Sequence, residues 1–135
     1  MNEKLNSAWW ALRIGLGAAP FLAGLDKFFN LLAKWETYLN PMVPRLIPVS
    51  PATFMHAVGV VEMAVGLAIL TRWTRLGAYV AAVWLVAIAL NLLAMGAFLD
   101  VAVRDLLLAL SAFTLARLTE VREAEAGAPA WKLSA

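Results

Sequence analysis

The sequence contains no cysteine and a single histidine, His56. The absence of cysteine excludes disulfides, thiol–disulfide exchange, cysteine-ligated clusters and thiolate zinc sites within this chain. A single histidine excludes a haem held by two histidines of the same copy. We therefore expect no electron-carrying centre, no metal site and no tightly bound cofactor in the chain itself.

Charged residues are also scarce: they make up 15% of the 135 residues, against roughly a quarter in soluble domains. The formal net charge is only +2 and the basic residues are scattered, so no nucleic-acid partner is predicted. Apolar residues make up 63%, and the mean hydropathy is +0.78. A soluble fold of this size could not bury so much apolar surface, which predicts an integral membrane protein in contact with the lipid bilayer.

Four apolar segments are candidates for membrane-spanning helices, each of which takes about 20 mainly apolar residues. Arg13 lies inside the first segment, which favours a retained helix over a cleaved signal peptide. The fold class predicted is all-α, an integral membrane four-helix bundle. Its spans are expected at about 8–27, 52–70, 76–98 and 101–118.

The connection between the first two spans is long and has two parts. Its start, Lys27–Trp35, is amphipathic, which predicts a short helix in the plane of the membrane interface. Four prolines follow between positions 41 and 51, and they predict an extended, turning chain. Ser50 and Pro51 suit the N-cap and the first turn of the second span.

The distribution of lysine and arginine predicts the orientation. In a chain of four spans, both termini and the second connection lie on one side, which carries six of these residues. The other side carries three, or four with Arg104. We therefore predict a multi-pass protein of a bacterial-type inner (plasma) membrane with cytoplasmic N and C termini. Residues 1–118 form the transmembrane domain, and 119–135 are predicted to be a loose cytoplasmic tail.

Polar residues inside a membrane need a partner or a water-filled cavity, so each one is a functional candidate. On the first span, Arg13, Gly17, Gly24 and Lys27 fall on one helix face at about 100° per residue. The glycines permit close approach of another helix. This face is either a packing seam alone, with Lys27 reaching the interface, or part of a polar site.

Glu62 lies near the middle of the second span, where a carboxylate is most costly. It is either protonated or paired with a cation, for which Arg13 and Lys27 are the candidates. The pair would be structural or would form part of a ligand site. His56 lies about 120° away around the same helix, nearer its outer end.

The last two spans add Asn91, Arg104 and Asp105. Because adjacent residues point about 100° apart on a helix, Arg104 and Asp105 are expected to pair with other helices rather than with each other. We predict a polar pocket in the outer half of the bundle, covered by the long connection. The alternative is that these polar residues only hold the helices together. The candidate site residues are Arg13, Lys27, His56, Glu62, Asn91, Arg104 and Asp105.

The chain resembles the DoxX-like family of small four-helix membrane proteins. The resemblance rests on Arg13–Ile14–Gly15, on Gly24–Leu25–Asp26–Lys27, and on Gly59, Glu62 and Gly66. It implies a four-helix membrane bundle and an association with quinone-linked sulfur oxidation and membrane oxidoreductase complexes.

Three functions are compatible with these features. The first is a small subunit or accessory protein of a membrane redox complex that binds a quinone-like or lipid ligand in the outer-half pocket. Such a chain would need partner subunits to supply the redox centre. The second is a non-catalytic lipid-binding or assembly module. A small transporter ranks third, and it would need to form a homo-oligomer because no inverted repeat is visible.

Overall fold

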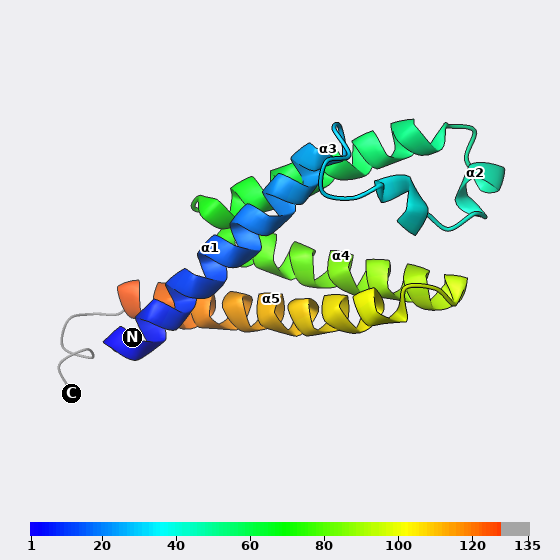
Figure 1. Ribbon diagram of the computed structural model, residues 1–135. Coiled ribbons are helices and arrows are strands. Elements are labelled where there is room, and N and C mark those ends of the chain that lie inside the picture. The colour runs from blue at the N-terminus through cyan, green and yellow to red at the C-terminus, as the bar shows by residue number, and fades with distance from the viewer. Residues whose placement is uncertain (128–135) are drawn as a thin grey trace.

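A computed structural model describes residues 1–127 of the chain, and these residues form helices and their connections without a β-strand (Figure 1). Four helices are long, and two short helical segments lie in the first connection. In chain order they are α1 (Glu3–Asp26), the 3₁₀ segment η1 (Trp35–Tyr38), α2 (Val43–Leu46), α3 (Pro51–Leu70), α4 (Thr74–Met95) and α5 (Leu99–Ala126).

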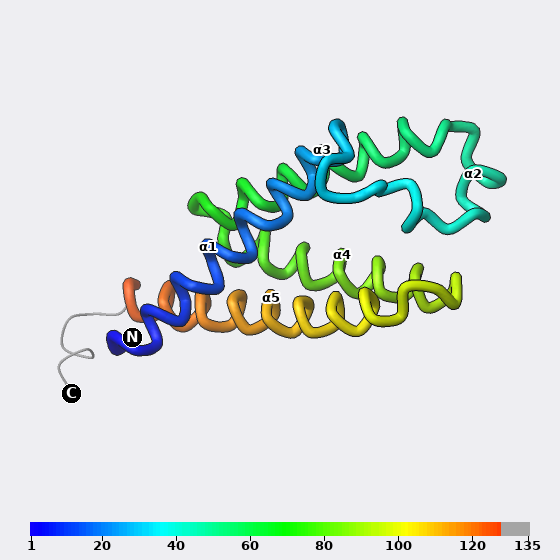
Figure 2. Tube along the Cα trace, viewed as in Figure 1, coloured from blue at the N-terminus to red at the C-terminus, as the bar shows by residue number. Residues whose placement is uncertain are grey.

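The long helices pack as two antiparallel pairs, α1 with α3 and α4 with α5. The pairs lie closest where α1 begins and α5 ends, and they diverge toward the end that carries the first connection, as the Cα trace shows (Figure 2). We call these the terminus end and the loop end. The fold is thus all-helical as predicted, but it is two splayed pairs with an additional short helix rather than a regular four-helix bundle.

Two facing glycines bring α1 and α3 together at each of two levels. A Cβ placed on Gly59 would lie 2.5 Å from the carbonyl oxygen of Gly24, and one placed on Gly66 would lie 2.5 Å from that of Gly17. Only glycine permits backbones to approach this closely. The glycine face predicted on the first span is therefore the α1–α3 contact.

Apolar side chains form a buried cluster at each end of the molecule. At the terminus end, a buried cluster joins all four long helices through small and large residues: Trp9, Leu16, Ile69, Ala78, Ala81, Ala112, Leu115 and Ala116. At the loop end, Ala89, Leu92 and Ala102 pack with Tyr38 and Phe98. The second cluster includes η1, so the first connection is packed onto the helices.

Three helices in the described part of the chain, α1, α3 and α4, are long and apolar enough to cross a membrane. Their outward side chains are apolar and exposed, for example Leu22 at 56% and Val83 at 72%, as expected of lipid-facing residues. α5 carries Arg104 and Asp105 near one end and Arg117 toward the other. Its role as a fourth span therefore remains a prediction.

The amphipathic start of the first connection does not form the predicted interfacial helix. The chain turns after α1, and Asn30 adopts a left-handed conformation with φ 54°. The Asp26 carboxylate accepts hydrogen bonds from the backbone N–H groups of Leu31 (3.0 Å) and Leu32 (2.8 Å). Such side-chain bonds to the backbone compete with helix formation. The predicted N-cap at Ser50 is confirmed, since its side chain accepts from the Thr53 N–H.

The prediction of a loose tail from residue 119 is wrong for residues 119–126, which continue α5. Tertiary contacts hold this extension: Trp9 Nε1 donates to Thr119 Oγ1 at 2.9 Å, and the Arg122 guanidinium lies 3.8 Å from the Trp9 ring centre. The N-terminal ammonium pairs with Glu125, which places the start of α1 beside the end of α5. Residues 128–135 lie outside the described part.

Candidate functional site

The end of α1 and the middle of α3 meet in a buried ion pair. Lys27 Nζ lies 3.0 Å from Glu62 Oε2, and the two side chains are only 5% and 10% exposed. The pair sits directly beside the Gly24–Gly59 contact, which brings the two backbones close enough for a short bridge. The prediction that Glu62 faces the charged face of the first helix is confirmed, with Lys27 as its partner.

Trp35 of η1 covers this pair from the side of the first connection. Its ring centre lies 3.8 Å from Lys27 Nζ, and its indole N–H donates to Asp26 Oδ2 at 2.9 Å. Lys27 is therefore held by a carboxylate and by the face of an aromatic ring. Asp26, the neighbouring residue, organises the turn that puts Trp35 in place.

Two residues of the other helix pair face the same position. Trp84 of α4 lies near the Glu62 carboxylate, yet its buried Nε1 has no hydrogen bond of normal geometry within the described chain. Asp105 of α5 is 5% exposed and acts on Glu62 through its charge. We call Lys27, Trp35, Glu62, Trp84 and Asp105 the polar centre.

The polar centre can bind and position a polar group. The Lys27 ammonium and the Trp84 indole are donors, while Glu62 and Asp105 are acceptors when ionised. In an environment of low dielectric these groups act strongly on one another and on any group placed among them. The described residues contain no cluster of histidine and acidic side chains suited to a metal ion.

Arg13 does not belong to the polar centre, contrary to the prediction that grouped it there. Its guanidinium donates to the carbonyl oxygens of Ile69 (3.0 Å), Leu70 (2.9 Å) and Thr71 (2.9 Å). These carbonyl groups lie at the end of α3, where the helix itself supplies too few donors, and the Thr74 hydroxyl also donates to those of Ile69 and Thr71. Arg13 is thus a cap for α3 at the terminus end, well along α1 from Lys27.

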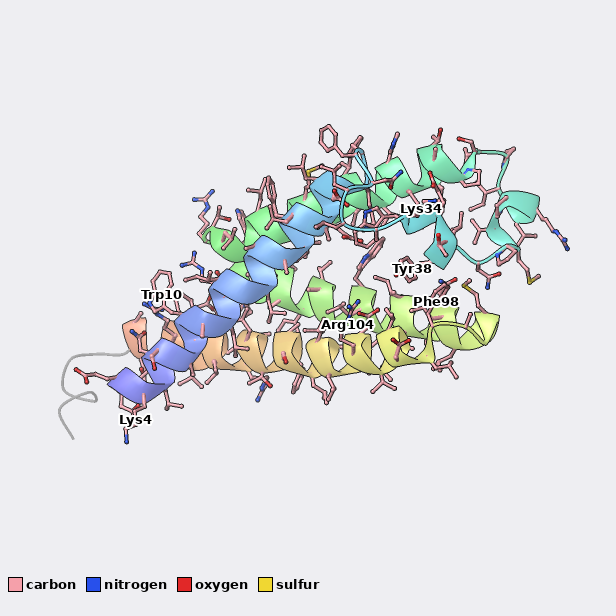
Figure 3. The ribbon with its side chains drawn as sticks, viewed as in Figure 1. Lys4, Trp10, Lys34, Tyr38, Phe98 and Arg104 are labelled. Atoms are coloured by element: carbon pink, nitrogen blue, oxygen red, sulfur yellow. The ribbon has the colours of Figure 1, made fainter. Side chains whose placement is uncertain are left out.

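His56 and Asn91 serve local contacts at the loop end. His56 is exposed and stacks on Phe28, with ring centres 4.6 Å apart and an angle of 13° between the rings. Asn91 Nδ2 donates to the carbonyl oxygen of Tyr38 at 2.9 Å, and the Tyr38 ring packs against Phe98 at 4.7 Å (Figure 3). Asn91 therefore anchors η1 on α4.

Arg104 and Asp105 pair with each other, so the expectation that they bind other helices is wrong. Arg104 Nη2 lies 3.5 Å from Asp105 Oδ1; the arginine side chain is 65% exposed and the aspartate side chain 7% exposed. The two Cβ atoms do point apart, but the long arginine side chain bends back across that angle. Arg104 lies at the edge of the polar centre.

The sequence analysis did not assign Trp35 or Trp84 to the site, because nothing local signals that an indole N–H faces a carboxylate from another element. Asp26 adjoins Lys27 in the sequence, and an acid at a helix end is a ready acceptor for the turn that follows.

Two surface hollows are found elsewhere on the described structure. One lies on α5 and is lined by Phe113, Thr114, Arg117, Leu118, Glu120, Val121 and Ala124. The other lies at the terminus end and is lined by Met1, Asn6, Arg122, Glu125 and Ala126. Neither hollow includes a residue of the polar centre, so the outer-half pocket stays a prediction.

The fold and the polar centre together define a small multi-pass helical membrane protein with a buried ion pair between two of its helices. The family model of DoxX matches residues 8–98, which include most of α1, the first connection, α3 and α4. The chain belongs to the DoxX family. Searches of the curated proteins and of the solved structures returned no match.

Proposed function

We propose that this protein is a small membrane subunit or accessory protein of a quinone-linked redox complex, and that a quinone-like ligand binds at the polar centre. The observation that carries the proposal is the indole N–H of Trp84. It is buried beside the Glu62 carboxylate, which is a nearby acceptor, but it makes no hydrogen bond of normal geometry to a group of the described chain. Buried donors are nearly always satisfied, so an oxygen acceptor from a ligand would complete this site.

The chemistry of the donor set fits a quinone head group. Lys27 and Trp84 offer N–H donors to carbonyl oxygens, and Glu62 offers an acceptor to a hydroxyl of the reduced form. A carboxylate in this position can also take up a proton. The electrons would come from a partner subunit, since this chain has no cysteine and one histidine.

Trp35 and the rest of η1 would act as the cover of the site. The Trp35 ring lies on Lys27, and η1 is fastened to α4 by Asn91 and Tyr38. Because the Trp35 ring lies directly on Lys27, a ligand would enter as Trp35 moves aside. This cover corresponds to the lid role predicted for the first connection.

The test is the content of small molecules and subunits in gently detergent-extracted protein, measured by mass spectrometry for wild type and Trp84→Phe. The variant removes a donor that makes no normal hydrogen bond, so we expect loss of bound quinone with little change in the unfolding temperature. Trp73→Phe, at an exposed tryptophan, is the matched control and should retain the ligand. Equal quinone content in wild type and Trp84→Phe would contradict the proposal.

The alternative function is a lipid-binding or assembly module without redox chemistry. It is favoured by the close pairing of Lys27 with Glu62, since each of these two groups already has the other as a partner. Under this alternative the extracted protein carries phospholipid or a partner chain and no quinone, and Glu62→Gln lowers stability without altering the bound molecules.

A further inference from the structure

One side of α5 faces α1 at the terminus end and is exposed at the loop end. Arg122 lies over Trp9 of α1 and Thr119 accepts from the same indole, so this side of the helix points at α1. Arg104 lies about five helical turns earlier and therefore on the same side. There α1 has turned away to pair with α3, and the Arg104 side chain is 65% exposed.

Residues of three kinds follow one another along this exposed side of α5. Asp100, Arg104 and Leu108 are each four residues apart and share a ridge of the helix. Asp100 is exposed in the first turn, Arg104 is exposed one turn further in, and Leu107 and Leu108 are 60% and 38% exposed beyond them. From the loop end inward, the order is thus negative, positive, apolar, with a rise of about 6 Å between the charges.

Arg104 has unused hydrogen-bonding capacity. Its guanidinium carries five N–H donors, and its one ion pair in the described chain is the 3.5 Å contact with Asp105. The residue lies in the second turn of α5, one turn further along the helix than the exposed Asp100. Figure 3 shows Arg104 on the side of α5 that faces the first connection.

We propose that Asp100, Arg104 and the leucines after them form a binding site for a phospholipid with a primary ammonium in its head group. Arg104 binds the phosphodiester, because guanidinium and phosphate make charge-assisted hydrogen bonds. Asp100 binds the ammonium, and the acyl chains lie along Leu107 and Leu108. A zwitterionic head group has its phosphate nearer the chains and its ammonium outermost, which is the order of the charges on α5. This site does not depend on the ligand of the polar centre.

The experiment is native mass spectrometry of delipidated protein in detergent, titrated with phosphatidylethanolamine, phosphatidylglycerol or inorganic phosphate. We expect wild type to retain phosphatidylethanolamine over phosphatidylglycerol and to show no displacement by inorganic phosphate. Arg104→Gln should weaken retention of both lipids about tenfold, the loss of one charge-assisted hydrogen bond. Asp100→Asn should weaken phosphatidylethanolamine alone and abolish the preference.

The order of the charges is tested by Asp100→Arg combined with Arg104→Asp, which keeps the composition and net charge but reverses the sequence of charges. The swapped protein should lose the preference for phosphatidylethanolamine. Arg45→Gln, at an exposed arginine of α2, is the control and should bind both lipids as wild type does. Retained preference in the swapped protein, unchanged binding in Arg104→Gln, an equal loss in Arg45→Gln, or displacement by inorganic phosphate would each overturn the proposal.

Discussion

The carbonyl oxygen of Gly59 would lie 2.5 Å from a Cβ placed on Gly24, and the carbonyl oxygen of Gly24 would lie equally close to a Cβ on Gly59. The two backbones are therefore in direct contact at the level of the polar centre. Lys27 lies one turn beyond Gly24 and Glu62 one turn beyond Gly59, so this contact sets the length of the Lys27–Glu62 bridge.

Gly59→Ala should separate α1 from α3 and lower stability by about 1–3 kcal/mol, the usual cost of overpacking. Thermal unfolding in detergent, followed by circular dichroism, measures the loss. The matched control is Gly15→Ala in α1, where an added Cβ meets no atom within 4 Å. That variant should be neutral or more stable, because alanine favours helix over glycine by about 1 kcal/mol. Equal stability of the two variants would contradict the close contact.

Lys27→Met and Glu62→Gln should each lower stability by about 3–5 kcal/mol, because each leaves the other group buried without its partner. The double variant should lose much less than the sum of the two. A double-mutant cycle by thermal unfolding measures this coupling. The control cycle uses Arg75 and Glu123, which lie 3.3 Å apart but are 55% and 49% exposed, and it should give less than about 1 kcal/mol. Additive losses at Lys27 and Glu62 would show that the two side chains do not stabilise each other.

Arg13→Gln should destabilise the end of α3, because three carbonyl oxygens lose a charged donor. A loss of about 1.5–3 kcal/mol is expected for hydrogen bonds to a charged group. Hydrogen exchange should show faster exchange at Ile69 to Thr71 and little change near Lys27. Arg72→Gln, in the same turn, is the control and should leave this region protected. A loss of protection spread evenly over the molecule would argue against a capping role.

Thr119→Val should loosen the extension of α5 from α1, because the buried Trp9 indole loses its acceptor. The expected cost is about 1–3 kcal/mol. Thr114→Val is the matched control: Thr114 also bonds the carbonyl four residues earlier, but it is exposed and makes no contact of this kind with Trp9. Comparable unfolding temperatures for the two variants would show that the Trp9–Thr119 hydrogen bond does not hold α5 to α1.

Both termini should lie in the cytoplasm. The ion pair between the N-terminal ammonium and Glu125 places the start of α1 and the end of α5 at one end of the molecule, and the lysine and arginine count favours that end as cytoplasmic. A reporter active only in the periplasm should be inactive when fused after residue 135 and active when inserted near Asn40. The reverse pattern would invert the topology and turn the polar centre toward the cytoplasm.

Much of the fold follows from hydropathy and helix periodicity. The helix at Pro51 begins at the Ser50 cap as predicted, and the face shared by Gly17, Gly24 and Lys27 is the one that meets α3. These features are local, since they depend on composition and on spacing along a single helix. Glu62 was predictable as an inward-facing residue because a charge in a membrane needs a partner.

The choice of partners depended on the tertiary structure. Arg13 and Lys27 share a face of α1, and periodicity alone treats them alike. Because α1 and α3 are antiparallel and touch at Gly24 and Gly59, Lys27 lies level with Glu62. Arg13, further back along α1, lies beside the end of α3.

Trp84 of α4 lies at the same centre although it follows Glu62 by more than 20 residues in the sequence, and Trp35 lies there because Asp26 organises the turn before it. The sequence by itself determined that this protein is helical, that it lies in a membrane, and that one helix face carries charge. Only the packing of the helices decided which charges meet, because the depth at which two helices cross is set by where their backbones can touch.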